Sequence, residues 1–131
     1  MKVVLDASAA VEVVLGRNQA KRLAGVLEEA DVVLAPELFI PEVVNTIWKY
    51  HQFEHLSLGA CDRAMEAALA LVDTLVLSKE TYAEAFLLAR TAHRPVYDMF
   101  YLALARREDA VFLSVDKALR KEAGHQGVRV A

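Results

Sequence analysis

The chain has a single cysteine, Cys61, among its 131 residues, so it can form no internal disulfide bond. A lone thiol is typical of proteins in a reducing compartment, and a cytoplasmic location is expected. Charged residues interrupt every apolar run before it reaches the ~20 residues that a membrane-spanning helix needs. The opening segment becomes acidic at Asp6, too early for a signal peptide. The sequence therefore points away from secreted and membrane-spanning proteins.

An excess of positive charge is also missing. The formal net charge is −3 at pH 7, whereas a surface that binds nucleic acid normally carries many basic residues. This objection holds only if the acidic residues are spread over the surface. Acids that converge on divalent cations reverse the local field, so that a phosphate can bind beside them. The positions of the acids therefore matter more than the net charge.

Apolar residues make up 56% of the chain, which is enough for one domain over residues 1–131 with a buried core. Short β-branched runs alternate with longer Ala- and Leu-rich stretches of helical spacing. The runs expected to form strands are 3–5, 31–34, 74–77, 111–113 and 128–130. The stretches expected to form helices are 7–29 (broken near Gly16), 41–55, 58–72, 79–93, 97–107 and 117–123. This alternation predicts an α/β fold in three α/β/α layers, with a central parallel sheet of about five strands.

Four acidic residues fall at the same expected edge of this sheet. Asp6 directly follows the run 3–5, and Asp116 comes shortly after the run 111–113. Glu42 and Asp98 lie in the first turns of two expected helices. Because ligands of parallel α/β sheets bind beyond the carboxyl ends of the strands, all four side chains can meet in one pocket.

Any one of these acids could simply cap a helix or favour its dipole. Four carboxylates gathered together repel one another and raise their pKa values, which a fold tolerates when a cation lies between them. Ligands that are all oxygen suit Mg²⁺ or Mn²⁺ better than zinc. The sequence therefore predicts a magnesium site, with Mn²⁺ as a substitute, formed by Asp6, Glu42, Asp98 and Asp116.

Small polar residues accompany the acids. Ser8 stands two residues after Asp6, Ser114 two before Asp116, and Asn45 about one helical turn after Glu42. Their side chains can orient carboxylates and bound water, although ordinary capping also explains the two serines.

Other polar residues are weaker candidates. Cations near the expected pocket could hold the phosphate groups of a ligand, but a solvated helix face explains them better. They are Lys49, Arg94, Lys117, Arg120 and Lys121. His51 and His55 stand four residues apart, a spacing that can bind zinc, but they lack the glutamate of the protease motif. Their place near a helix C-terminus, where imidazoles suit the dipole, accounts for them better.

Four segments taken together resemble the PIN-domain ribonucleases, in particular the VapC-type toxins of toxin–antitoxin pairs. They are residues 4–8, 41–45, 95–105 and 112–116. The resemblance implies a metal-dependent endoribonuclease with Asp6 as the central metal ligand and Asn45 as a supporting side chain. It also implies a homodimer and a VapB-like antitoxin partner. Ser114 stands where the family usually has threonine, which preserves the hydroxyl group.

Rival classes fit less well. A phosphorelay receiver needs an aspartate after its third strand, whereas Ser78-Lys79-Glu80 follows the run 74–77. A phosphatase with an aspartate nucleophile needs a second acid where Ser8 stands. The alternative that stays open is a PIN fold that binds RNA or protein with little or no catalytic activity. Metal-dependent cleavage of RNA separates it from the nuclease.

Overall fold

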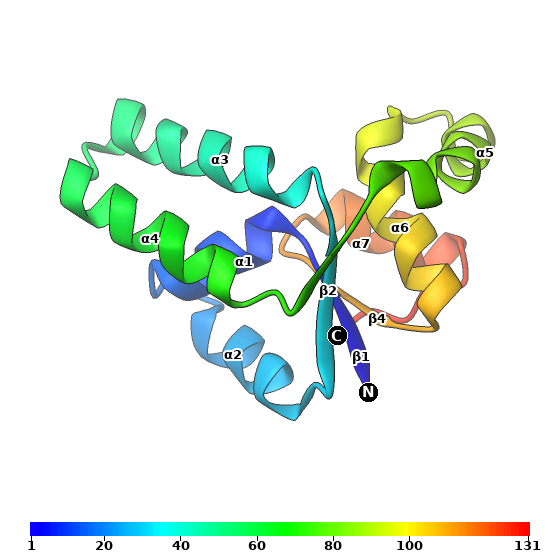
Figure 1. Cartoon of the computed structure of the whole chain (residues 1–131), viewed down its shortest axis with the longest axis horizontal. Helices are drawn as coiled ribbons and strands as arrows, with labels where there is room; N and C mark the ends of the chain where they lie inside the picture. Colours follow the sequence, from blue (N-terminus) through cyan, green and yellow to red (C-terminus); the bar gives the residue numbers. More distant parts are fainter.

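A parallel four-stranded sheet lies at the centre of the computed structural model, which describes residues 1–131 (Figure 1). Its strands are β1 (Lys2–Leu5), β2 (Val32–Pro36), β3 (Thr74–Val76) and β4 (Val111–Leu113). The order across the sheet is β3-β2-β1-β4. In the register, Val3 lies beside Val33 on one side and Val111 on the other. Because every pair is parallel, all four strands end at the same edge.

Helices cover both faces of this sheet. They are α1 (Ala7–Val14), α2 (Ala20–Glu29), α3 (Phe39–Glu54), α4 (Leu58–Ala70), α5 (Tyr82–Ala92), α6 (Val96–Glu108), α7 (Lys117–His125) and the short 3-10 helix η1 (Ser78–Glu80). The expected break near Gly16 is confirmed, because this glycine adopts a left-handed φ of 64° after α1 has ended. Figure 1 shows α3 and α4 running side by side away from the sheet. No helix combines the length and the apolar character needed to cross a membrane.

Alternate residues of β1 enter two separate cores, which is why the fold has three layers. Val3 and Leu5 pack with α1 to α4 on one face, whereas Val4 packs with α5 to α7 on the other. All three side chains are fully buried, and burial of an aliphatic side chain contributes roughly 1.5–3 kcal/mol. The predicted α/β/α fold with a parallel central sheet is confirmed.

The segment 128–130, expected to be a fifth strand, forms only an isolated parallel bridge between Val130 and Phe112 of β4. The N–H of Phe112 donates to the carbonyl of Arg129 at 2.8 Å. One residue earlier, the N–H of Val128 donates to the carbonyl of Ala123 and so closes the end of α7. Because the N–H of Val128 is bonded to the end of α7, only the residues after it pair with β4, and no regular strand forms.

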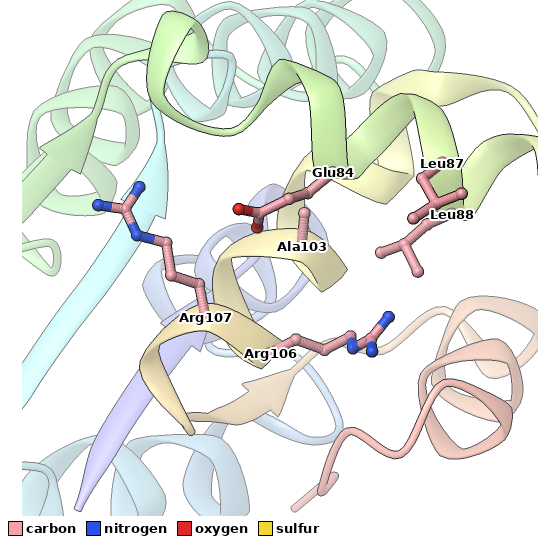
Figure 2. A pocket seen from close by; sticks show the side chains of 6 residues that line it. All are labelled: Glu84, Leu87, Leu88, Ala103, Arg106 and Arg107. Atoms are coloured by element: carbon pink, nitrogen blue, oxygen red, sulfur yellow. The ribbon is translucent and has the colours of Figure 1, made fainter.

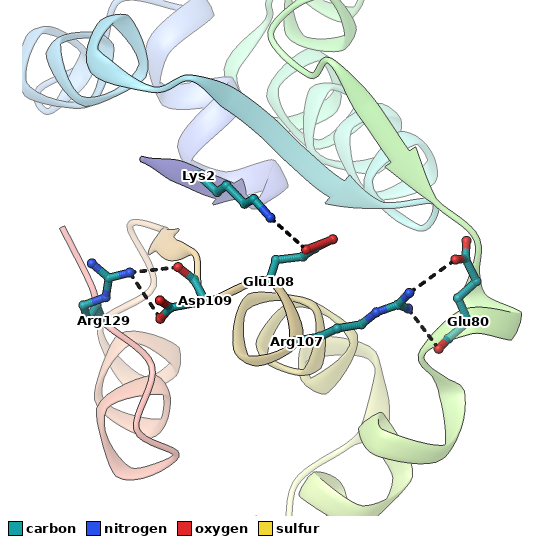
Figure 3. Close-up of polar contacts among 6 residues, drawn as sticks. All are labelled: Lys2, Glu80, Arg107, Glu108, Asp109 and Arg129. Carbon is teal, nitrogen blue, oxygen red and sulfur yellow. Dashed lines mark hydrogen bonds and ion pairs between the residues drawn. The ribbon is translucent and has the colours of Figure 1, made fainter.

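The amino edge of the sheet carries exposed ion pairs, two of which are drawn in Figure 3. Lys2 Nζ lies 3.1 Å from Glu108 Oε2, and Arg129 lies 3.3 Å from Asp109 Oδ1. The N-terminal amino group contacts Asp31 at the start of β2. Exposed ion pairs contribute at most about 1 kcal/mol each, so these contacts balance charge more than they stabilise the fold.

Candidate metal centre

The carboxyl edge of the sheet holds a pocket of about 170 Å³ that contains all four predicted acids. Asp6 leads from β1 into α1, Asp116 precedes α7, and Glu42 and Asp98 lie in the first turns of α3 and α6. The complete lining is Asp6, Ala7, Ser8, Glu42, Thr46, Asp98, Tyr101, Asp116 and Leu119. Four separate elements therefore deliver one carboxylate each to the same place.

Asp6 is the most buried of the four acids, with 5% of its surface exposed. It caps α1, because its Oδ1 accepts hydrogen bonds from the N–H of Ala9 at 2.9 Å and from the hydroxyl of Ser8 at 2.7 Å. Burial raises the pKa of Asp6 to about 6, and the charge of Asp116 adds to the rise. Hydrogen bonds from Ser114, Ala9 and Ser8 act in the opposite direction. Asp6 is held firmly in a place where its charge is unfavourable.

Asp116 is positioned by a similar cap at the start of α7. Its Oδ1 accepts a hydrogen bond from the N–H of Leu119 at 3.0 Å. Its own N–H donates to Ser114 Oγ, also at 3.0 Å. Its second carboxylate oxygen has no hydrogen-bond donor in the chain, so that oxygen is available to a ligand.

Ser8 and Ser114 join the two corners that carry Asp6 and Asp116. Ser8 Oγ accepts from the N–H of Val115 at 3.2 Å and lies 3.3 Å from Ser114 Oγ. The single proton of the Ser8 hydroxyl goes to Asp6, and the single proton of the Ser114 hydroxyl can go either to Asp6 or to Ser8. The two serines therefore position Asp6 and Asp116, because they bond to the Asp6 carboxylate and to the backbone N–H groups of Val115 and Asp116.

Glu42 reaches the pocket from α3 and meets Tyr101 of α6. The hydroxyl of Tyr101 donates to Glu42 Oε1 at 2.6 Å. Partial burial raises the pKa of Glu42, the bond from Tyr101 lowers it, and the charges of Asp98 and Asp6 raise it again. Burial and the neighbouring Glu42 raise the pKa of Tyr101 far above its ordinary value. Tyr101 therefore stays a hydrogen-bond donor at physiological pH.

Asp98 has the only cationic partner among the four acids. Arg94, one turn earlier, places Nη2 3.7 Å from Asp98 Oδ2. Partial burial raises the pKa of Asp98, the charge of Asp116 raises it further, and Arg94 lowers it. One guanidinium group thus faces a pocket with four carboxylates.

The donor chemistry fits a hard divalent cation. Every ligand atom is oxygen, which suits Mg²⁺ or Mn²⁺, and a bound cation would offset the burial and the mutual repulsion that raise the pKa values of Asp6, Glu42 and Asp98. In this structure no three of the carboxylates are placed to bind one ion together. Binding by three acids therefore requires rotation of at least one side chain.

Some candidates from the sequence lie elsewhere. Asn45 is exposed and does not line the pocket, whereas the next residue, Thr46, does line it and donates to the carbonyl of Glu42 at 2.8 Å. His51 Nδ1 is bonded to the carbonyl of Leu56 at 2.6 Å, and His55 ends α3 with a left-handed φ of 59°. These histidines form no metal cluster.

Tyr101, like Thr46, lines the pocket but was not predicted from the sequence as a site residue. Its spacing along α6 fits core packing, and its ring is indeed buried beside Phe112, with 6.2 Å between the ring centroids. One signal was available: Tyr101 lies three residues after Asp98, so both residues fall on the same side of α6.

A larger pocket of about 290 Å³ lies between α5 and α6 (Figure 2). Glu84 is the only acid in its lining, and Arg106 and Arg107 face it as well. Leu87, Leu88 and Ala103 complete it. It offers no cluster of oxygen ligands, so the smaller acidic pocket is the better candidate for chemistry.

Comparison with known proteins agrees with the fold. The family model of the PIN domain matches residues 3–124, and the chain belongs to the PIN domain family. The resemblance to PIN-domain proteins seen in the sequence is thereby confirmed.

Individual relatives are distant in sequence. The chain is 26% identical over 124 residues to Ribonuclease VapC3 of Pyrobaculum aerophilum, a match that covers 93% of this chain and 95% of that protein. The crystal structure of PAE2754 from Pyrobaculum aerophilum superposes with a TM-score of 0.75 at 17% identity, covering 99% of this chain and 89% of that one. VapBC2 from Rickettsia felis, solved with a DNA fragment from its promoter, gives a TM-score of 0.67 at 12% identity, covering 100% and 98%. At these identities the two structures establish the fold.

Proposed function

We propose that this PIN-domain protein is a divalent-metal-dependent endoribonuclease and the toxin of a toxin–antitoxin pair. The observation that carries the proposal is the pocket in which Asp6, Glu42, Asp98 and Asp116 converge from four elements. The similarity to Ribonuclease VapC3 supports RNA as the substrate. The likeness of the fold to that of VapBC2 is consistent with a toxin that has an antitoxin partner.

The four acids would hold Mg²⁺, or Mn²⁺ in its place. Such an ion supplies Lewis-acid stabilisation of the charge that grows on the phosphate and lowers the pKa of a water molecule. Asp6 would be the central ligand, as the resemblance to the VapC-type toxins implies, and its hydrogen bonds and burial leave its carboxylate little freedom. Ser8 and Ser114 link the segments that carry Asp6 and Asp116 and so fix the positions of these two acids.

The reaction is hydrolysis by water, without a covalent intermediate on the protein. The hydroxyl groups of Ser8, Thr46 and Tyr101 all donate to acceptors within the chain, and no histidine lines the pocket to activate them. The oxygen of water bonds to phosphorus, and the bond from phosphorus to the 3′ oxygen breaks. That oxygen takes up a proton, which leaves a 3′-hydroxyl and a 5′-phosphate.

We propose two protein partners, a second copy of the chain and a small VapB-like antitoxin. Helices α3 and α4 expose large apolar side chains, namely Val44, Trp48, Phe53 and Leu58. Trp48 and Phe53 lie edge to face with 6.0 Å between their ring centroids. An exposed apolar patch of this kind marks a protein interface, and we assign it to the homodimer. Sedimentation of wild type and Trp48→Asp tests this, since the variant is expected to sediment as a monomer.

The alternative is a PIN fold that binds RNA or protein with little or no activity. It is favoured by one observation, that no three carboxylates are placed to share an ion. Binding of RNA without cleavage in the presence of Mg²⁺ or Mn²⁺ is the result this alternative predicts.

Cleavage of RNA by the purified chain tests the nuclease directly. We expect cleavage with Mg²⁺ or Mn²⁺, none with a chelator, and a loss of at least about a hundred-fold in Asp6→Asn, since losing even a supporting group of a metal site costs 10–100-fold. Asparagine can keep the helix cap, so the variant should fold.

The matched control is Asp109→Asn, the same substitution at an exposed acid of the amino edge. It should cut RNA at the wild-type rate. A folded Asp6→Asn protein that cuts equally fast, or cleavage that persists in chelator, rules out the proposed mechanism.

A further inference from the structure

We propose that Tyr101 is a positioning residue that sets the affinity of the pocket for its divalent cation by acting through Glu42. The inference rests on the proposed metal-dependent function. Tyr101 stands on α6, which also supplies Asp98, and only 1% of its surface is exposed. Its hydroxyl reaches Glu42 across 59 residues of sequence.

The bond between Tyr101 and Glu42 fixes which carboxylate oxygen can face a ligand. Oε1 accepts the phenol proton at 2.6 Å, whereas Oε2 has no hydrogen-bond donor in the chain. Without this bond the carboxylate could rotate freely, because Glu42 is only partly buried on α3. A ligand whose orientation is set in advance binds a metal more tightly than a mobile one.

Tyr101 is itself rigidly held. Its ring packs in the core formed by α5, α6, α7 and β4, tilted by 46° against Phe112. Tyr101 lines the same pocket as Asp6 and Ala7, the first residue of α1. One buried phenol thus lies beside the corner that carries Asp6 and donates to Glu42 of α3.

A purely structural tyrosine predicts a different behaviour. Loss of its hydroxyl would lower the stability of the fold and leave the affinity for metal unchanged. A positioning residue changes the affinity for metal and acts only while Glu42 is present. The two roles are therefore separable by measurements of metal binding without RNA.

The test is calorimetric titration of Mn²⁺ into the full chain and into Tyr101→Phe. We expect the variant to bind Mn²⁺ about 10- to 100-fold more weakly. At saturating Mn²⁺ its kcat for RNA should approach that of wild type, because the acids themselves are intact. Tyr82→Phe, the same change at an exposed tyrosine of α5, should bind Mn²⁺ as wild type does. Circular dichroism in chelator establishes that each variant is folded.

A second pair of variants shows whether Tyr101 acts through Glu42. Glu42→Gln should bind Mn²⁺ weakly through the three remaining acids, and adding Tyr101→Phe should weaken it no further. An equal loss in both backgrounds overturns the proposal. A Tyr101→Phe variant that binds Mn²⁺ as tightly as wild type also overturns the proposal. The proposed nuclease function is unaffected by that result if wild type binds Mn²⁺ and Asp6→Asn does not. Wild type that fails to bind Mn²⁺ overturns both.

A spectroscopic measurement covers the case in which Tyr101→Phe does not fold. In protein labelled with 3-fluorotyrosine, the ¹⁹F resonance of Tyr101 should shift during titration with Mg²⁺. The same resonance should not move in Glu42→Gln over the same concentrations. If wild type binds Mg²⁺ and the Tyr101 resonance does not shift, the proposal is contradicted.

Discussion

The two edges of the sheet differ in whether their acidic residues are paired with cationic groups. At the amino edge, Asp31 meets the N-terminal amino group, Glu108 meets Lys2 and Asp109 meets Arg129. At the carboxyl edge, only one of the four acids has a cationic partner, since Arg94 pairs with Asp98 and with none of Asp6, Glu42 and Asp116.

The pKa values follow this difference. The N-terminal amino group lowers the pKa of Asp31, whereas burial and the charge of Asp116 raise the pKa of Asp6 to about 6. A sequence selected only for stability would pair or disperse such acids, as it does at the amino edge. Unbalanced charge that is kept at one edge indicates a role for that edge in binding, and a divalent cation is the partner that its oxygen ligands suit.

The largest effect on stability should come from removing the charge of Asp6. Its pKa rises from 3.8 to about 6 on folding, which corresponds to about 3 kcal/mol at pH 7. Without metal, Asp6→Asn should therefore be more stable than wild type by up to about 3 kcal/mol, as measured by urea denaturation in chelator. Asp109→Asn should change the stability by less than about 0.5 kcal/mol, as is usual for surface changes. A less stable Asp6→Asn would show that the edges do not differ as described.

Addition of metal should stabilise wild type nearly as much. An ion that binds only the folded state contributes about 2.7 kcal/mol at a concentration a hundred times its Kd. Urea denaturation with and without Mn²⁺ measures this effect, and Asp6→Asn should gain far less. Equal gains in the two proteins would place the binding site away from Asp6.

Acidification should stabilise the metal-free protein moderately. The folded state holds a proton on Asp6 up to about pH 6, whereas the unfolded chain releases it near 3.8. The folded state therefore binds more protons between these values, and stability rises as the pH falls through 6. From pH 7 to pH 5 we expect a gain of about 1 kcal/mol in chelator. The raised pKa values of Glu42 and Asp98 act in the same direction. The gain from Asp6 should be absent in Asp6→Asn.

The smallest effect should follow a change at the amino edge. Lys2→Gln removes an ion pair in which the lysine side chain is 48% exposed. Exposed pairs contribute 0–1 kcal/mol, so the loss in urea denaturation should stay below about 1 kcal/mol. The affinity for Mn²⁺ should not change. If Lys2→Gln changed the free energy of unfolding as much as Asp6→Asn does, the amino and carboxyl edges would not differ in their effect on stability.

Much of the fold could be predicted from the sequence, because local patterns specify most of it. The apolar runs 3–5 and 111–113 are short and β-branched, and they form the buried strands β1 and β4. The run 128–130 has the same composition, but Val128 is engaged by the end of α7 and only a bridge forms. Hydrophobic pattern does not reveal such competition for backbone hydrogen bonds.

The pocket shows the same limit. The rule that ligands bind at the carboxyl ends of parallel strands was enough to predict that the four acids line one pocket. It could not identify Tyr101, whose role depends on a contact with Glu42 that crosses from α6 to α3. Nor could it distinguish Asn45 from Thr46, since a difference of one residue on a helix turns the side chain by about 100°.

The most direct test of the account is a crystal of the wild-type chain grown with Mn²⁺ and measured for anomalous scattering of the metal. We expect an anomalous peak within coordination distance of Asp6 and at least two of Glu42, Asp98 and Asp116. A site that stays empty at Mn²⁺ concentrations that support cleavage, or a peak bound elsewhere, would contradict it.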